Sequence, residues 1–266
     1  MTKASIQRRK VGQLNIAFRN VGKGAPLIMF HGAEGDHQIY DRLQDELGDG
    51  VRSISFDQRD CGLTEYADPQ PYTLKDVAHD AVRLMDSLGL ASAHVMGNSI
   101  GGNLAQLMAF HWPDRVDRLI LGLTWPADES LQELNPDGIA KRAEYAAMGA
   151  AGERLMVEHM ASPEYVAAHP GIIDELRSLR TEVTPEARQR RWTAFTSPYA
   201  VDPARIRHKT LLIGGGADRM VPAAITQRLA ARMPDARFEV LQGAGHLGAR
   251  QMPRELAALI GNFLNE

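Results

Sequence analysis

The chain has 266 residues, of which 44% are hydrophobic and 24% are charged, and its formal net charge is −3 at pH 7. These values are ordinary for a globular domain that buries a substantial core. The slight excess of acidic groups offers no basic surface to nucleic acid or to an anionic membrane. No stretch reaches the roughly 18 to 20 apolar residues that a membrane-spanning helix needs. We therefore expect a soluble protein with neither nucleic acid nor a membrane as its partner.

The N-terminus and the single cysteine both indicate a cytoplasmic protein. The basic residues within 3–10 are followed by no apolar core, so no signal peptide is expected. Cys61 has no second cysteine to pair with, which fits a reducing compartment. It lies in a predicted turn without a catalytic histidine pattern nearby, and we interpret it as a bystander thiol. The sequence contains neither H-E-x-x-H nor paired cysteines, so no metal site is expected.

Strand and helix patterns alternate through the first half of the chain. Residues 5–9 and 14–19 predict an opening hairpin at a sheet edge. Further strands are predicted at 27–30, 51–56, 93–96 and 119–123, and helices at 74–88 and 103–110. This alternation is typical of a mainly parallel sheet with helices on both faces, which binds ligands beyond the carboxyl ends of its strands.

The strand pattern stops between residues 125 and 206. Short helices are predicted there at 140–148, 153–160, 171–179 and 185–195. Strands resume at 210–213 and 238–241, which brings the predicted total to eight. The sequence therefore predicts an α/β core formed by 1–124 and 207–266, with a helical insertion at 125–206 after the sixth strand.

Residues 97–102, Gly-Asn-Ser-Ile-Gly-Gly, carry the strongest chemical signal in the chain. They follow the predicted strand 93–96 and precede a helix pattern. A serine at the apex of a sharp strand-to-helix turn has strained backbone angles, so small residues are needed two positions away on each side; Gly97 and Gly101 meet that need. The first helical N–H groups would then point toward whatever the serine attacks. We interpret Ser99 as a nucleophile, the alternative being an ordinary glycine-rich turn.

A nucleophilic serine needs a general base, and the base needs an orienting acid. Asp218 follows the predicted strand 210–213, and His246 follows 238–241. Both residues are thus expected beyond the carboxyl ends of parallel strands, at the same sheet edge as Ser99. The sequence therefore predicts a Ser-His-Asp triad. Two alternatives stay open: Asp218 only caps a helix, and His246 is an ordinary loop histidine.

These motifs resemble the α/β-hydrolase family over nearly the whole chain. The triad order Ser, Asp, His is the family's order. Residues 27–33 match its strand followed by His-Gly, 57–64 resemble its D-x-R-G-x-G-x-S turn, and 113–116 and 243–246 are further matches. The resemblance implies the α/β-hydrolase fold, with an eight-stranded sheet and the insertion as a lid over the active site. The pattern is most similar to enol-lactonases, proline iminopeptidase-like enzymes and methyl esterases of aromatic polyketides.

Two stretches depart from the family pattern. Asp60 replaces the usual glycine and Thr64 the usual serine in the turn at 57–64. The loop at 33–36 lacks the double glycine and proline of iminopeptidases, which weakens the peptidase interpretation. Its acids, Glu34 and Asp36, are interpreted as part of an acidic surface loop; the alternative is that they recognise a cationic substrate group.

The family's oxyanion hole and substrate pocket can be placed on this chain. The resemblance assigns one oxyanion N–H donor to Ile100, after the nucleophile, and the second to the first loop, where Ala33 is the best candidate. His31 is expected to hold that loop through hydrogen bonds rather than to titrate in the reaction. Seven side chains of the insertion are predicted to line an apolar pocket, or alternatively to pack only within the lid: Trp125, Tyr145, Met148, Met156, Met160, Trp192 and Phe195.

The predicted chemistry is two-step acyl transfer without a cofactor, on a small-molecule ester or lactone. His246 takes the proton of Ser99, and Asp218 stabilises the imidazolium. Alternatives on the same triad are a C–C bond hydrolase, an amidase or aminopeptidase, and a cofactor-free haloperoxidase-like perhydrolase. A cofactor-independent oxygenase and a non-catalytic small-molecule receptor are further alternatives, and the receptor is disfavoured because all three triad residues are present. The physiological substrate and the oligomeric state, a homodimer included, stay open.

Overall fold

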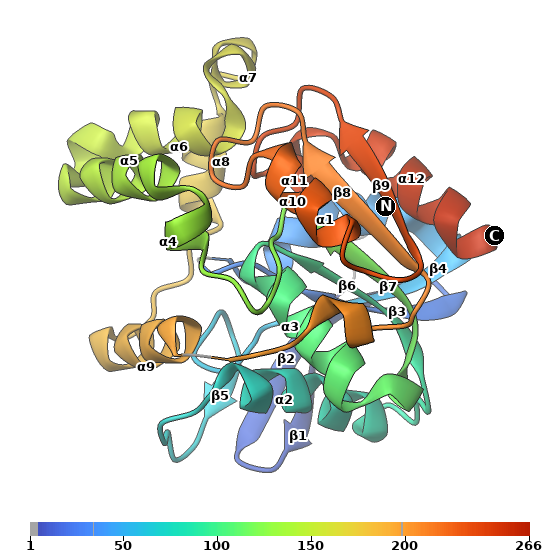
Figure 1. Cartoon of the computed structure of the whole chain (residues 1–266). Coiled ribbons are helices and arrows are strands. Elements are labelled where there is room, and N and C mark those ends of the chain that lie inside the picture. The colour runs from blue at the N-terminus through green and yellow to red at the C-terminus, as the bar shows by residue number, and fades with distance from the viewer. Residues whose placement is uncertain (1–4, 34, 198) are drawn as a thin grey trace.

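A mainly parallel sheet runs through the centre of the molecule (Figure 1). The computed structural model describes residues 5–33, 35–197 and 199–266. Its strands are β1 (Gln7–Val11), β2 (Leu14–Val21), β3 (Ala25–Phe30), β4 (Val51–Phe56), β5 (Glu65–Tyr66), β6 (Ala93–Asn98), β7 (Val116–Gly122), β8 (Thr210–Gly215) and β9 (Ala236–Leu241). Among the described residues they form one nine-stranded sheet, in the order β1-β2-β4-β3-β6-β7-β8-β9 with β5 paired to β2.

Only the pairings that involve β2 are antiparallel. The hairpin of β1 and β2 is antiparallel, as are the pairings of β2 with β4 and with β5. All pairings from β4 through β3, β6, β7 and β8 to β9 are parallel. This confirms the predicted mainly parallel sheet and its opening hairpin. The sequence did not indicate β5, which is only two residues long and so too short for a periodic pattern.

Helices cover both faces of this sheet (Figure 1). The core helices are α1 (Asp41–Leu47), α2 (Leu74–Ser87), α3 (Ile100–His111), α10 (Ala223–Ala230), α11 (Gly248–Gln251) and α12 (Pro253–Asn265). Short 3-10 turns lie at η1 (His37–Tyr40), η2 (Gly48–Gly50), η3 (Pro113–Arg115), η4 (Gly149–Gly152) and η5 (Pro203–Arg205). One buried cluster packs α2, α3 and α10 on one face, and a second packs α1, α11 and α12 on the other.

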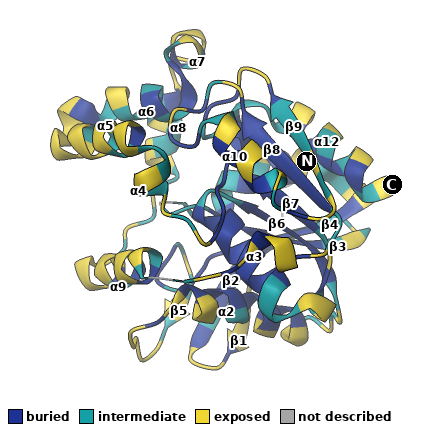
Figure 2. Ribbon diagram, viewed as in Figure 1, coloured by how far each residue is buried: buried dark blue, intermediate teal, exposed yellow. Residues whose placement is uncertain are grey.

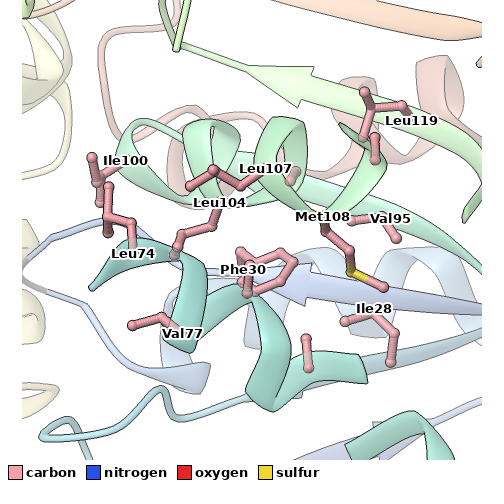
Figure 3. Close-up of a cluster of buried hydrophobic side chains, with 14 of the residues drawn as sticks. Ile28, Phe30, Leu74, Val77, Val95, Ile100, Leu104, Leu107, Met108 and Leu119 are labelled. Atoms are coloured by element: carbon pink, nitrogen blue, oxygen red, sulfur yellow. The ribbon is translucent and has the colours of Figure 1, made fainter. Parts of the chain in front are cut away.

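The central strands are buried on both sides, which explains their unbroken apolar sequences. In β3, Leu27 and Met29 belong to the cluster on the α12 face, whereas Ile28 and Phe30 belong to the cluster on the α3 face. Figure 3 shows both side chains beneath α3, with Phe30 close to Leu104 and Ile28 close to Met108. Figure 2 shows the resulting contrast between a buried sheet and the exposed outer surfaces of the helices.

Helices, and no strand, occupy the described residues between β7 and β8. They are α4 (Leu131–Leu134), α5 (Pro136–Ala147), α6 (Glu153–Ala161), α7 (Pro163–Ala168), α8 (Ile172–Ser178) and α9 (Pro185–Thr196). Three of them carry a proline in their first turn, where its missing N–H has no helical partner to lose. In Figure 1, α4 to α8 lie together on one side of the insertion, and α9 lies apart from them near β5 and α2. No helix of the described chain is long and apolar enough to cross a membrane.

Candidate active site

Ser99 lies in a strained turn between β6 and α3. Its backbone has φ 57° and ψ −129°, a conformation that non-glycine residues rarely adopt. A Cβ added at Gly97 would lie 2.0 Å from the carbonyl oxygen of Gly101, and one added at Gly101 would lie 2.3 Å from that of Phe30. Both flanking positions therefore require glycine, because the turn packs tightly against its own helix and against β3. The predicted strand-turn-helix context of Ser99 is confirmed.

Hydrogen bonds to the end of β7 hold this turn. The N–H of Ser99 donates to the carbonyl of Gly122 at 3.0 Å, and the hydroxyl of Thr124 donates to the carbonyl of Ser99 at 2.8 Å. A Cβ on Gly102 would lie 2.5 Å from the Thr124 hydroxyl oxygen, so this third glycine makes room for that contact. These bonds use only the Ser99 backbone and place its side chain in the cavity described below.

Asp218 and His246 meet beyond the carboxyl ends of β8 and β9. Nδ1 of His246 lies 2.8 Å from Oδ2 of Asp218. The other oxygen of Asp218, Oδ1, accepts the N–H groups of Met220 and Val221, both at 2.8 Å. The carboxylate is fully buried and the imidazole is nearly so. Because Oδ2 is an acceptor, it favours the proton on Nδ1 and leaves Nε2 as the basic ring nitrogen.

One cavity of about 790 Å³ brings the predicted catalytic groups together. Ser99 and His246 both line it, and so do Ile100 and Ala33. Ile100 is the first residue of α3, where N–H groups have no partner within the helix. Asp218 is not among the lining residues, because it lies behind His246. Nor does it cap α10, whose N-cap is Pro222 and has no side-chain cap.

Five of the seven predicted pocket residues line this cavity: Trp125, Met156, Met160, Trp192 and Phe195. Trp125 is buried, whereas Trp192 is 54% exposed and belongs to the rim. The predictions for Tyr145 and Met148 are wrong, because neither residue lines the cavity. The ring of Tyr145 packs edge-on against His159, with 6.0 Å between centroids, and Met148 is exposed.

Sequence reasoning missed other apolar lining residues, among them Val157, Leu176 and Tyr199. Val157 lies three positions before Met160 on α6, so a helical stripe that ends at Met160 could have identified it. Tyr199 follows the last lid helix, and its hydroxyl donates to Asn103 Oδ1 at 2.9 Å. No periodic signal in the sequence marks a loop residue of this kind.

His31 holds the first loop, as predicted. It is fully buried, its Nδ1 lies 2.8 Å from the carbonyl oxygen of Gly32, and its Nε2 accepts the N–H of Gln58 at 3.3 Å. Burial, aided by the nearby charge of Arg191, lowers the pKa of His31 to about 4. The ring is therefore neutral at pH 7, and it fixes the backbone that leads to Ala33.

Because His31 is buried in its neutral form, we expect the protein to lose stability in acid. The pKa of His31 is depressed from 6.5 to about 4, so its contribution to stability is complete above pH 6.5 and is lost as the pH falls toward 4. The loss across that window is about 3 kcal/mol. His31→Asn should be less stable at pH 7 but should lose less stability on acidification. Urea unfolding at pH 7 and pH 4.5 measures both, with the exposed His169→Asn as control. An unchanged pH dependence in His31→Asn would contradict this assignment.

The prediction that Asp36 belongs to an acidic surface loop is wrong. This side chain is 6% exposed and lines the cavity. It accepts the N–H of Gln38 at 2.8 Å and the hydroxyl of Thr181 at 2.6 Å. Asp36 thus caps η1 and ties the first loop to the segment between α8 and α9. Glu34 lies outside the described residues.

The structure explains the two residues of the turn at 57–64 that differ from the family pattern. Asp60 adopts φ 59° and forms a two-armed ion pair with Arg190 of α9, with distances of 2.8 and 2.6 Å. Thr64 donates its hydroxyl to the carbonyl of Asp57 at 2.7 Å and accepts the N–H of Ala17 at 3.0 Å. The neighbouring Cys61 is buried, and burial raises the pKa of its thiol to about 12. That agrees with a bystander thiol.

Among the described residues, one group has donor atoms close enough to hold a metal ion: Asp36, His37 and Asp57. Its donor atoms are already hydrogen-bonded. Nδ1 of His37 lies 2.7 Å from Oδ1 of Asp57, whose Oδ2 accepts the N–H of Leu63 at 2.6 Å. Through these hydrogen bonds the cluster holds together the loops beside the site.

Comparisons with known proteins agree with the fold described above. The sequence profile described as alpha/beta hydrolase fold matches residues 25–249. RutD of Caulobacter sp. strain K31, named for carbamate hydrolysis, is 26% identical over 90% of this chain and 90% of its own. The 2-hydroxymuconate semialdehyde hydrolase of Pseudomonas sp. strain CF600 is 28% identical over 92% of this chain and 88% of its own. The solved enol-lactonase of Burkholderia xenovorans LB400 has a TM-score of 0.83 at 21% identity, and the alignment covers 98% of this chain and 100% of that chain.

Proposed function

The chain belongs to the alpha/beta hydrolase fold family, and on that premise we propose that it is a serine hydrolase of carboxylic esters or lactones. The observation that carries the proposal is the contact of 2.8 Å between Nδ1 of His246 and Oδ2 of Asp218. His246 shares a cavity with Ser99, which lies at the apex of a strand-to-helix turn. Nucleophile, base and orienting acid are thus present together, and this supports acyl transfer through an acyl-enzyme.

The mechanism follows from these positions. Nε2 of His246 takes the proton of Ser99 as the serine oxygen attacks the carbonyl carbon, and Asp218 stabilises the imidazolium. The N–H groups of Ile100 and Ala33 hold the oxyanion, a contribution of about 3 kcal/mol per donor. The imidazolium then protonates the departing alcohol. A water molecule activated by the same histidine releases the acid and restores Ser99.

The cavity favours a substrate with a sizeable apolar part. Its volume of about 790 Å³ lies in the range of small-molecule sites. Beyond the catalytic groups, the insertion contributes Trp125, Met156, Val157, Met160 and Phe195 to the lining. Their apolar area binds the acyl or alcohol portion by removing it from water, at about 25 cal/mol per Å².

Truncation of the pocket is expected to change specificity rather than chemistry. Met156→Ala and Trp192→Ala should lower kcat/KM for bulky esters by about 1 to 3 kcal/mol, or roughly 5- to 150-fold. The effect of Trp192→Ala should be the smaller, because that ring is 54% exposed. Hydrolysis of p-nitrophenyl acetate should change little, since the acetyl group fills little of the pocket. Met148→Ala, at an exposed position outside the lining, is the matched control. An equal large loss for small and bulky esters would contradict the pocket assignment.

C–C bond hydrolysis is the second candidate. It is supported by the relative named 2-hydroxymuconate semialdehyde hydrolase, which is similar to this chain over 92% of its length. If this candidate holds, kcat/KM for the semialdehyde should exceed that for every ester, and Ser99→Ala should abolish its turnover.

A substrate panel tests the proposed function. It comprises p-nitrophenyl esters of increasing chain length, lactones and enol-lactones, a carbamate, amino-acid anilides and 2-hydroxymuconate semialdehyde. We expect the largest kcat/KM for an ester or lactone, and no turnover of that substrate by Ser99→Ala. A larger kcat/KM for the semialdehyde or the carbamate, dependent on Ser99, would replace the ester assignment with that alternative.

A further inference from the structure

The carboxyl end of helix α6 is bonded to the loop that carries His246. The N–H of His246 itself donates to the carbonyl of Met160 at 2.6 Å. A Cβ added at Gly245 would lie 2.5 Å from the carbonyl oxygens of both Met160 and Ala161. The backbone of His246 and of the residue before it is therefore in direct contact with the insertion.

A single side chain reinforces this contact. Gln251, at the end of α11, accepts the N–H of Gly245 through Oε1 at 3.0 Å. Its Nε2 donates to the carbonyl of Ala161 at 2.9 Å. The two partners fix the amide orientation, because one is a donor and the other an acceptor. Gln251 thus joins the residue before the base to the last residue of α6.

The same helix contacts the substrate space. Met156, Val157 and Met160 of α6 line the cavity, and Met160 also supplies the carbonyl that His246 binds. We propose that Gln251 is a positioning residue. Through it, the position of α6 over the cavity determines how well His246 is aligned with Ser99. The inference rests on the proposed triad. It adds that the insertion supports the catalytic base as well as binding the substrate.

Three other contacts between core and insertion differ in this respect. Asp60 pairs with Arg190 of α9, and Asp36 accepts the hydroxyl of Thr181. Arg250 pairs with Glu175 of α8. None of these contacts involves the loop at 242–247. They attach the insertion to the core without contacting the base, and one of them therefore supplies a matched control.

Two variants separate the two hydrogen bonds of Gln251. Gln251→Glu keeps an oxygen for the N–H of Gly245 but places a second oxygen against the carbonyl of Ala161, so it breaks the hydrogen bond to α6. Gln251→Leu removes both hydrogen bonds at similar side-chain volume. Thr181→Val removes a core–insertion hydrogen bond of 2.6 Å elsewhere and is the control.

The test is the rate at which a fluorophosphonate modifies Ser99, together with kcat and KM for p-nitrophenyl acetate. We expect both Gln251 variants to lower the modification rate and kcat by about 10- to 100-fold, because a misplaced base costs that much. KM should stay within about twofold, and Thr181→Val should behave as wild type. A merely structural role would lower the melting temperature without this split between kcat and KM.

The outcomes distinguish the two proposals. Wild-type protein that is not modified at Ser99 would contradict the proposed function itself. Wild-type protein modified at Ser99, with Gln251→Glu reacting at the same rate, would overturn the role of Gln251 alone. So would an equal loss of rate in Thr181→Val, because the effect would then come from any loosening of the insertion.

Discussion

Ser99→Ala is expected to lower kcat/KM for the best ester or lactone by at least about 10⁴-fold while the protein stays folded. The loss is large because no other group can form the acyl-enzyme. Folding is preserved because the Ser99 backbone, not its hydroxyl, bonds to Gly122 and Thr124. Alanine meets the same backbone strain at φ 57° as serine does. The measurements are kcat/KM and the melting temperature, with the exposed Ser87→Ala as control. Residual activity within tenfold of wild type would show that Ser99 is not the nucleophile.

Asp218→Asn is expected to lower kcat by about 10⁴-fold. The N–H groups of Met220 and Val221 both donate to Oδ1 of Asp218, so they will hold the oxygen of the new amide at that position. Its NH₂ group then faces Nδ1 of His246 and forces the ring proton onto Nε2. A ring in that tautomer cannot accept the proton of Ser99, although the geometry is nearly unchanged.

The control for this substitution is Asp235→Asn, an exposed acid remote from the site. It should keep full activity. Circular dichroism and the melting temperature should show that Asp218→Asn is folded. A loss of less than about tenfold in kcat would mean that Asp218 does not set the tautomer of His246 and serves only to hold its own turn through the N–H groups of Met220 and Val221.

The core of the fold was predictable because a strand that is buried on both faces of the sheet needs apolar residues at successive positions. Residues 27–30 are uniformly apolar since alternate side chains enter two different clusters. The placement of Asp218 and His246 was predictable for a related reason: the carboxyl ends of parallel strands share one sheet edge. Among the elements that the sequence did not indicate are β5 with its two residues and α4 with its four. Elements of that length contain about one repeat of their pattern, which is too little to reveal a period.

The insertion was less predictable because its helices bury little surface. Only Gly138 of α5 is buried, so no apolar stripe shows which way Tyr145 faces. Asp36 was misplaced because its partner Thr181 lies 145 positions away in the sequence. The contact of His246 with α6 could not be predicted at all, since it joins the N–H of one residue to the carbonyl of another and leaves no trace in side-chain identity.

Intact mass and peptide mapping after fluorophosphonate treatment test the central claim most directly, because they need no knowledge of the substrate. The account predicts one adduct per chain, on the peptide that contains Ser99. It predicts no adduct in Ser99→Ala and a much slower one in Asp218→Asn. An adduct on another residue, or equal labelling of wild type and Ser99→Ala, would contradict the assignment of Ser99, His246 and Asp218 as a catalytic triad.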